Sequence, residues 1–163
     1  SAAAKTLRTE LSDRELEDLA AWCSRGRTLH ASASDLPRQM PGLAPPELAG
    51  DVHTIERIPE LAEQARRNLA EAGYDRVRVH VGDGSLGLPE EAPFTAIAVA
   101  AAAPGLPERL YEELEPRGRL AVPVGGRWGQ RLELIVRSPE GPAIIHSVPC
   151  RFVPLVGEGG FDR

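Results

Sequence analysis

Residues 51–84 constrain the fold of this chain more than any other stretch, because they contain one complete strand–helix–strand unit. The β-branched residues of the run DVHTI favour a strand, which ends at the charged pair Glu56-Arg57. Pro59 follows where a first helical residue is favoured, since its missing N–H would have no partner there. Gly73 is placed to end that helix, because glycine adopts the left-handed conformation at little cost.

The helix and second strand of this unit have clear periodicities. Leu61, Ala65 and Leu69 recur at every fourth position and therefore share one face that can pack on a sheet. The alternating run VRVHV at residues 77–81 predicts the second strand, which leads into Gly-Asp-Gly at 82–84. A strand, a crossover helix and a strand of this size predict a right-handed parallel βαβ unit.

Two acids follow the two strands of this unit, Glu56 after the first and Asp83 after the second. In an open α/β sheet, ligands bind beyond the carboxyl ends of the strands, where both acids should stand. One acid can accept from both hydroxyls of a ribose and the other from an adenine amine, while Gly82 and Gly84 let the backbone approach a flat ring. Each acid also has a local alternative, because Glu56 can pair with Arg57 or cap the next helix and GDG can be only a turn. Their occurrence at matched strand ends favours a nucleotide site.

The rest of the chain extends the sheet. The apolar run at 94–103 is typical of a parallel strand covered on both faces, and a short helix opens at Pro107. Further strands are predicted at 120–124, 132–136 and 143–153, with a glycine-rich hairpin joining the first two. The pattern predicts an α/β fold with a mostly parallel, doubly wound sheet and an antiparallel pair at one edge. The strands at 77–81, 96–99 and 120–124 are expected to be buried and mutually parallel.

Four segments carry a family resemblance: ERIPELAEQARRNL, VRVHVGDGSLGLPEEAPFTAIAVAAAAP, LEPRGRLAVPVG and RFVPLVG. Over residues 51–161 the chain resembles the protein-L-isoaspartate O-methyltransferases, which methylate isoaspartyl residues of damaged proteins. The resemblance implies a Rossmann-like sheet, S-adenosylmethionine as methyl donor and S-adenosylhomocysteine as product. It also implies isoaspartyl proteins or peptides as partners.

The resemblance further assigns residues to the site. The implied cofactor-binding residues, with Glu56 on the ribose and Asp83 on the adenine amine, are Glu56, Arg57, Gly82, Asp83 and Gly84. The implied peptide-binding residues lie in the RFVPL segment and are Arg151, Val153 and Leu155. No catalytic acid or base is assigned, because the donor is an activated sulfonium and the protein mainly aligns the acceptor and excludes water.

Residues 1–50 lie outside the resemblance. The capping box Ser-Asp-Arg-Glu at 12–15 predicts a helix that ends at Gly26, whereas residues 27–50 contain four prolines and read as a loop or strained linker. In this region the family has a central strand, a glycine-rich turn around the methionine end of the cofactor, and a serine-containing substrate segment. None of these is recognised here, since Ser32 and Ser34 lie in different surroundings. We therefore expect residues 1–50 to be a helix and linker joined to a methyltransferase-like domain at 51–163, a single domain overall.

This departure leaves two alternatives open. The chain can be a truncated or rearranged relative that acts as a non-catalytic binding or partner subunit. It can also be a methyltransferase for another small molecule or peptide. Because the methionine half of the cofactor lacks its usual turn, methyl transfer by this chain is expected to be slow or undetectable.

Composition excludes several other classes. A net charge of −5 and 4% aromatic residues give no basis for nucleic-acid binding. No apolar run is long enough to span a bilayer, so no membrane association is expected. Cys23 and Cys150 fit no metal-ligand spacing, which favours a reduced, cytoplasmic protein without a metal. The histidines at 53, 80 and 146 are interpreted as half-exposed strand positions, and the oligomeric state is left open.

Overall fold

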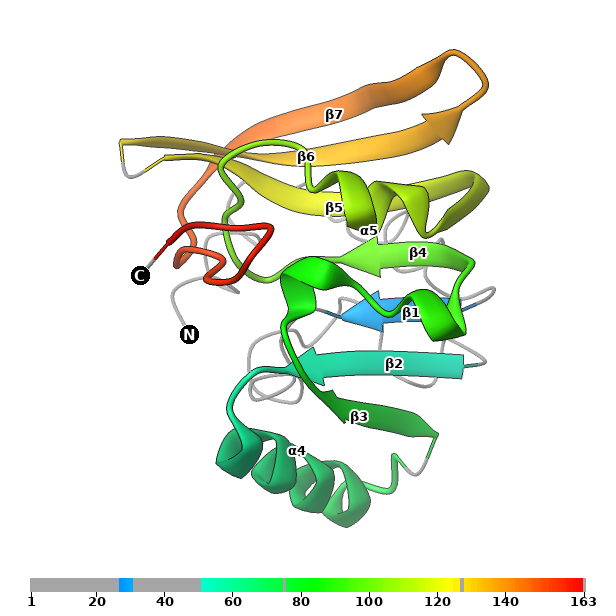
Figure 1. Cartoon of the computed structure of the whole chain (residues 1–163), viewed down its shortest axis with the longest axis vertical. Helices are drawn as coiled ribbons and strands as arrows, with labels where there is room; N and C mark the ends of the chain where they lie inside the picture. The colour runs from blue at the N-terminus through cyan, green and yellow to red at the C-terminus, as the bar shows by residue number, and fades with distance from the viewer. Residues whose placement is uncertain (1–26, 31–50, 75, 127, 163) are drawn as a thin grey trace.

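The computed structural model of the chain describes residues 27–30, 51–74, 76–126 and 128–162. Within them the strands form a seven-stranded sheet in the order β3-β2-β1-β4-β5-β6-β7 (Figure 1). Neighbours from β3 to β5 are parallel, whereas β6 and β7 are antiparallel, which confirms the expected α/β fold and its antiparallel edge. The strands are β1 (Arg27–His30), β2 (Asp51–Glu56), β3 (Val77–Val81), β4 (Phe94–Ala98), β5 (Leu114–Gly126), β6 (Gly129–Ser138) and β7 (Gly141–Cys150).

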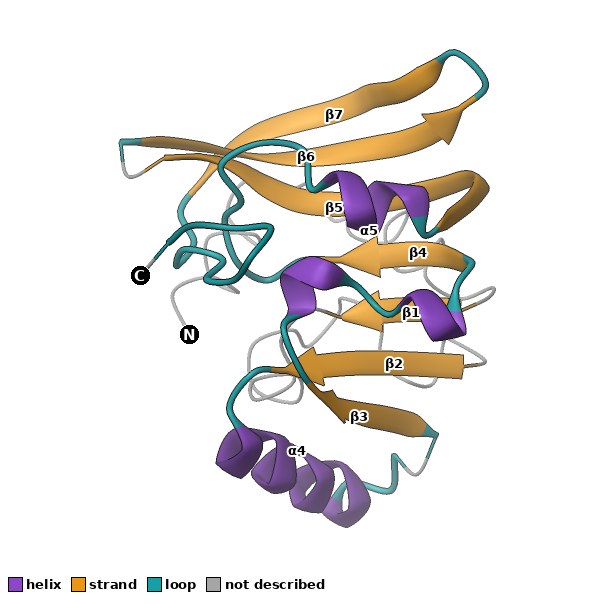
Figure 2. Cartoon of the chain, in the orientation of Figure 1, coloured by secondary structure: helices purple, strands orange, loops and turns teal. Residues whose placement is uncertain are grey.

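The strand–helix–strand unit forms as predicted. Helix α4 (Pro59–Glu71) begins at Pro59 and joins the parallel strands β2 and β3 (Figure 2). Gly73 follows the helix with φ +78°, the left-handed conformation that favours glycine. The buried face of α4 consists of Ala62, Ala65 and Leu69, so the predicted stripe is confirmed except that Leu61 is only half-buried.

Strand β1 corrects the prediction for residues 27–50. The sequence was expected to form a loop or linker there, yet Arg27–His30 lies in the middle of the sheet and pairs in parallel with both β2 and β4. A four-residue run with one strongly apolar residue, Leu29, gives little local signal, and pairing with two neighbours defines the strand instead. The proline-containing stretch at 31–50 and the helix predicted before Gly26 lie outside the described residues.

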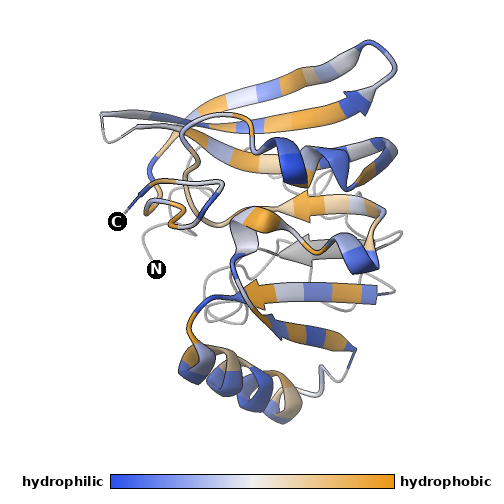
Figure 3. Cartoon of the chain, viewed as in Figure 1, coloured by the Kyte–Doolittle hydropathy of each residue, from blue (hydrophilic) through white to orange (hydrophobic). Residues whose placement is uncertain are grey.

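The core lies around the centre of the sheet. Phe94, Ile97, Leu120 and Val122 are fully buried on β4 and β5, and Figure 3 shows the hydrophobic colouring of β4. Helix α5 (Glu108–Glu112) adds the buried Leu110 to the same cluster. Burial on this scale stabilises a domain by roughly 1.5–3 kcal/mol for each large apolar side chain.

Several predicted bounds and exposures are corrected. Strand β3 is parallel but only half-buried, and Val81 is 49% exposed, because β3 is the edge strand of the sheet. Strand β5 runs from Leu114 to Gly126 and is therefore longer at both ends than the strand predicted at 120–124. Strand β4 ends at Ala98 and β7 ends at Cys150, so both are shorter than predicted.

Two short 3-10 helices and the C-terminal segment lie near the sheet. In Figure 1, η1 (Gly84–Leu86) and η2 (Pro89–Glu91) lie in front of the sheet between β3 and β4. The segment after β7, drawn in red, reaches the end of the sheet toward which β1, β2 and β4 point. Strand order reverses between β1 and β4 at the centre, and ligands of open α/β sheets bind at such a reversal.

Candidate functional site

Glu56 and Asp83 stand at the same edge of the sheet, as the sequence predicted. Glu56 is the last residue of β2 and pairs with Val81, the last residue of β3. The Gly82 N–H donates to the Glu56 carbonyl at 3.1 Å, which keeps the two strand ends together. Asp83 follows one residue later and precedes η1. The parallel register therefore brings together two acids that are 27 residues apart in sequence.

The Glu56 carboxylate is held in place beneath the start of α4. Its side chain is 8% exposed, and its Oε1 accepts a hydrogen bond from the Ile58 N–H at 3.0 Å. Ile58 is the residue that precedes the helix, so the acid binds the backbone just before α4, and no side-chain hydrogen bond caps the helix itself. Among the described residues, Ile58 alone donates to this carboxylate. A carboxylate has about four acceptor sites, so most of its capacity is left for a ligand.

The Asp83 carboxylate accepts three protein hydrogen bonds. Its Oδ1 accepts from the Ser85 N–H at 2.9 Å and from the Ser85 hydroxyl at 2.6 Å, and its Oδ2 accepts from the Glu158 N–H at 2.8 Å. Partial burial raises the pKa of Asp83, but these hydrogen bonds and the nearby charge of Arg57 lower it more. The net pKa lies below its ordinary value, so the carboxylate is charged at neutral pH.

The other expected cofactor residues flank these acids. Arg57 is exposed next to Glu56, and its charge acts on Asp83. Among the described residues, a Cβ added at Gly82 would meet only the Ile55 Cγ2 at 3.8 Å, which is an ordinary contact. Gly84 is buried as the first residue of η1.

The expected peptide-binding residues lie in the segment that follows β7. Arg151 is exposed and Val153 is 69% exposed, whereas Leu155 is 5% exposed and belongs to the core cluster. Ala102 anchors this segment, because its N–H donates to the Val153 carbonyl and its carbonyl accepts from the Leu155 N–H, both at 2.8 Å. The structure therefore leaves Arg151 and Val153 accessible and uses the Leu155 side chain as an anchor.

This arrangement agrees with the comparison to known families. A family model described as protein-L-isoaspartate(D-aspartate) O-methyltransferase matches residues 47–160. The chain belongs to this family. A protein-L-isoaspartate O-methyltransferase of Hyperthermus butylicus is 54% identical over 123 residues, which are 74% of this chain and 51% of the relative. The chain spans about half the length of the curated relatives that it matches.

Two solved structures share the fold of this family member. One, named protein-L-isoaspartate O-methyltransferase, has a TM-score of 0.74 at 23% identity and covers 89% of this chain and 46% of its own. The other is a Plasmodium falciparum protein described as a protein-L-isoaspartate O-methyltransferase in complex with S-adenosyl-L-homocysteine. Its TM-score is 0.63 at 21% identity, with 88% of this chain and 70% of that chain covered. At these identities the likeness extends to the fold.

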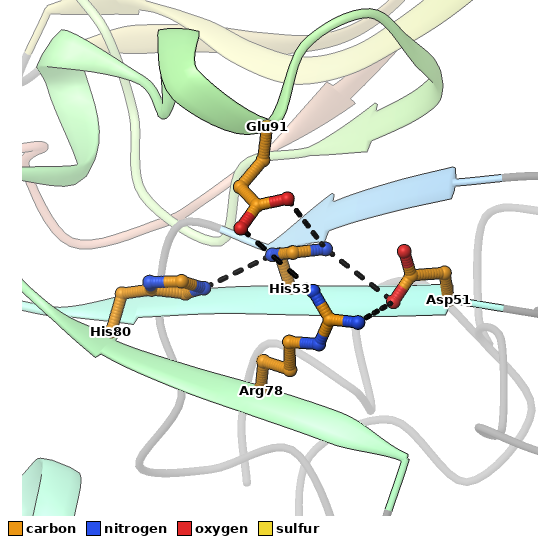
Figure 4. Close-up of polar contacts among 5 residues, drawn as sticks. All are labelled: Asp51, His53, Arg78, His80 and Glu91. Carbon is orange, nitrogen blue, oxygen red and sulfur yellow. Dashed lines mark hydrogen bonds and ion pairs between the residues drawn. The ribbon is translucent and has the colours of Figure 1, made fainter.

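A histidine pair in this family member was not predicted as a unit. His53 is fully buried rather than half-exposed, because η2 brings Glu91 over it and the Phe94 ring meets its edge. Figure 4 shows His53 and His80 side by side, with Asp51, Arg78 and Glu91 around them. The His53 Nε2 lies 3.4 Å from Asp51 Oδ1 and 3.9 Å from Glu91 Oε2. Arg78 lies within 3.8 Å of both acids, so two carboxylates and one guanidinium surround the buried ring.

Ser85 is the site residue that sequence reasoning missed. Its hydroxyl accepts from the Gly159 N–H at 3.0 Å while it donates to Asp83. The sequence Asp-Gly-Ser could have predicted the hydrogen bond from the Ser85 N–H to Asp83, since an aspartate often accepts from the N–H two residues further along the chain. The partner Gly159 is 74 residues away and leaves no such local signal.

No helix in the described part of the chain has the length and apolarity to cross a bilayer. No group of three or more histidine, cysteine, aspartate or glutamate side chains in it is arranged to hold a metal ion. The glycine-rich turn that the family places between its central strand and β2 would fall at 31–50, outside the described residues.

Proposed function

We propose that this chain takes part in methyl transfer from S-adenosylmethionine to isoaspartyl carboxylates of damaged proteins or peptides. The single observation that carries the proposal is the shared edge, where Glu56 ends β2 and Asp83 follows the adjacent strand β3. Asp83 also holds the segment that contains the expected peptide-binding residues. The names of the curated relatives support the same activity, although the chain spans about half of their length. We further propose that the protein works in the cytoplasm.

Glu56 is proposed to bind the ribose. Its carboxylate is buried, fixed by the Ile58 N–H, and retains acceptor sites for two hydroxyl donors. A charge-assisted hydrogen bond of this kind contributes about 1.5–3 kcal/mol. Because the acid is already oriented, little side-chain entropy is lost when the ribose binds.

Asp83 is proposed to accept from the adenine amine. Three of its roughly four acceptor sites are used within the protein, which leaves one on Oδ2. Gly82 supports this role, because it has no side chain and a flat ring can approach its backbone, with Ile55 the one contact that a Cβ there would make among the described residues. Arg57 and Gly84 complete the proposed cofactor set.

Arg151 and Val153 are proposed to contact the peptide. Arg151 carries a positive charge suited to the acceptor carboxylate, and Val153 offers an exposed apolar surface beside it. Leu155 contributes by anchoring the segment in the core. When bound, S-adenosylmethionine supplies a methyl group on a positively charged sulfur, so the residues need only hold the acceptor in line and exclude water.

Transfer of a tritiated methyl group to an isoaspartyl peptide tests the proposal, with the matching aspartyl peptide as control. We expect slow labelling of the isoaspartyl peptide and none of the aspartyl peptide. Equal labelling of both peptides would contradict the proposed acceptor. Efficient labelling of an unrelated carboxylate would favour the alternative of another methyl acceptor.

A further inference from the structure

The segment after β7 is fixed at two separate places, one in the loop that follows β4 and one just after β3. The first is Ala102, which exchanges two backbone hydrogen bonds with Val153 and Leu155. The second is formed by Asp83 and Ser85, which accept from the N–H groups of Glu158 and Gly159 at 2.8 and 3.0 Å. Asp83, Ser85, Gly157, Glu158 and Gly159 are called the clasp below. The exposed Val153 lies in the part of the segment that both places hold.

The clasp depends on close backbone approach. A Cβ atom added at Gly157 would lie 2.2 Å from Asp83 Oδ1 and 2.5 Å from Ser85 Oγ. A Cβ at Gly159 would lie 2.9 Å from the Ser85 carbonyl oxygen. The absence of side chains at these two positions therefore lets the C-terminal backbone contact the acid.

Ser85 connects the two halves of the clasp. Its side chain is buried, and its hydroxyl donates to Asp83 Oδ1 at 2.6 Å while it accepts from Gly159. The hydroxyl thus has one donor and one acceptor role, and both are satisfied. Outside the clasp, Arg109 adds an exposed ion pair to Glu158 at 3.0 Å, which contributes little because both side chains are solvated.

One carboxylate therefore serves two purposes. Asp83 Oδ2 accepts from Glu158 and retains the acceptor site assigned above to the adenine amine. The adenine amine and the Glu158 N–H both donate to Asp83, and both favour its charged form in the same orientation. Binding of the cofactor should therefore stabilise the Glu158 contact, and the Glu158 contact should strengthen cofactor binding to the same extent.

We propose that Asp83 and Ser85 are positioning residues that fix the peptide-binding segment to the cofactor edge, so that cofactor binding and the order of residues 155–161 are coupled. The inference rests on the proposed function for the identity of the cofactor and the peptide. The anchoring itself rests on the clasp contacts alone.

Hydrogen exchange on the full chain tests the anchoring without ligand. Gly157→Ala should push the segment away from Asp83, and the amides of Glu158 and Gly159 should exchange about tenfold faster or more, as expected on losing a hydrogen bond to a charged group. Gly126→Ala is the matched control, since a Cβ there meets nothing within 4 Å, and it should leave these amides unchanged. If the Glu158 and Gly159 amides of Gly157→Ala exchange as slowly as in the parent, while the β4 amides show that the fold is intact, the proposed anchoring of this segment is wrong.

Hydrogen exchange with S-adenosylhomocysteine tests the coupling. Saturating ligand should slow the Glu158 and Gly159 amides about fivefold or more in the parent chain, at the low end of typical coupling energies. The slowing should be lost in Gly157→Ala and kept in Gly126→Ala. Equal exchange with and without ligand would overturn the coupling, whether or not calorimetry detects binding.

Kinetics separate positioning from a general structural role. Ser85→Ala should raise the KM for the isoaspartyl peptide about tenfold while the Kd of S-adenosylhomocysteine changes less. An equal loss in both constants would contradict a positioning role. If calorimetry shows no ligand binding, the proposed function and the coupling both fail, whereas the anchoring is still decided by the unliganded exchange.

Discussion

The Nδ1 atom of the buried His53 lies 3.0 Å from the Nε2 atom of His80, and the two rings stack with centroids 5.2 Å apart. One nitrogen must donate and the other accept, so at least one of the two facing nitrogens is unprotonated. One arrangement satisfies this contact: the His80 Nε2–H donates to the His53 Nδ1, and the His53 Nε2 faces the Asp51 carboxylate. The pair is therefore compatible with two neutral rings.

The first prediction follows from the His80 pKa, which burial and the neighbouring His53 lower, with Arg78 adding to them and Glu91 and Glu90 opposing them. The unfolded chain, with an ordinary pKa of about 6.5, therefore takes up this proton before the folded chain does. The free energy of unfolding is therefore highest above about pH 6.5, where His80 is neutral in both states. It decreases as the pH falls through the lower pKa that His80 has in the folded chain. Thermal melts at pH 5–8 should show a steeper decline for the parent chain than for His80→Gln. Identical slopes would contradict the assignment.

The second prediction concerns Gly87, whose φ is +75° and whose added Cβ would lie 2.1 Å from Glu113 Oε1. Glu113 is buried and accepts from the Leu88 N–H at 2.8 Å, so Gly87→Ala adds a clash to the backbone strain. Gly73→Ala has the same strain at φ +78° with nothing within 4 Å. Urea unfolding should show a cost of about 1–2 kcal/mol for Gly73→Ala and a clearly larger cost for Gly87→Ala. Equal costs would show that the Glu113 contact has no effect.

The third prediction places a charge in the core. Ile97 is fully buried on β4, and Ile97→Asp leaves an unpaired charge there at a cost of several kcal/mol against a total stability of about 5–15 kcal/mol. Ile145 is exposed on β7 and provides the matched control, Ile145→Asp. Circular dichroism melts should show an unfolded Ile97→Asp protein and a control close to the parent. A cooperative Ile97→Asp transition near the parent Tm would contradict the packing.

The strand–helix–strand unit could be predicted because its signals are local. Pro59 and Gly73 mark the helix ends, and alternating valines mark the second strand. The positions of Glu56 and Asp83 followed from a general property of parallel sheets. Strand β1 could not be predicted, because Arg27–His30 is short and its partners are distant in sequence.

The burial of His53 and the clasp were missed for a related reason. His53 alternates with valine and threonine like any strand residue, and its burial depends on where η2 crosses the sheet. Glu158 and Asp83 are 75 residues apart, and their contact depends on a segment that returns after β7. Such long-range contacts are set by tertiary packing rather than by local sequence preference.

The fourth prediction concerns the departure from the family before β2. A family-type glycine-rich turn and helix in place of residues 31–50 should raise the methyl-transfer rate by orders of magnitude, because alignment of donor and acceptor within about 3–3.5 Å governs that rate. The graft should retain Arg27–His30, because β1 pairs with two strands. A shuffled sequence of residues 31–50 is the control. No labelling of the isoaspartyl peptide by either the parent or the grafted chain would contradict the proposed function.

Calorimetry with S-adenosylhomocysteine shows directly whether the sheet edge at Glu56 and Asp83 binds the cofactor. The variant Glu56→Gln removes the charge but can still accept from the Ile58 N–H, and Glu60→Gln removes an exposed charge from the first turn of α4. We expect binding in the micromolar range for the parent and Glu60→Gln, and a Kd about tenfold or more higher for Glu56→Gln. Absence of binding by the parent, or equal binding by Glu56→Gln, would contradict the proposed cofactor site.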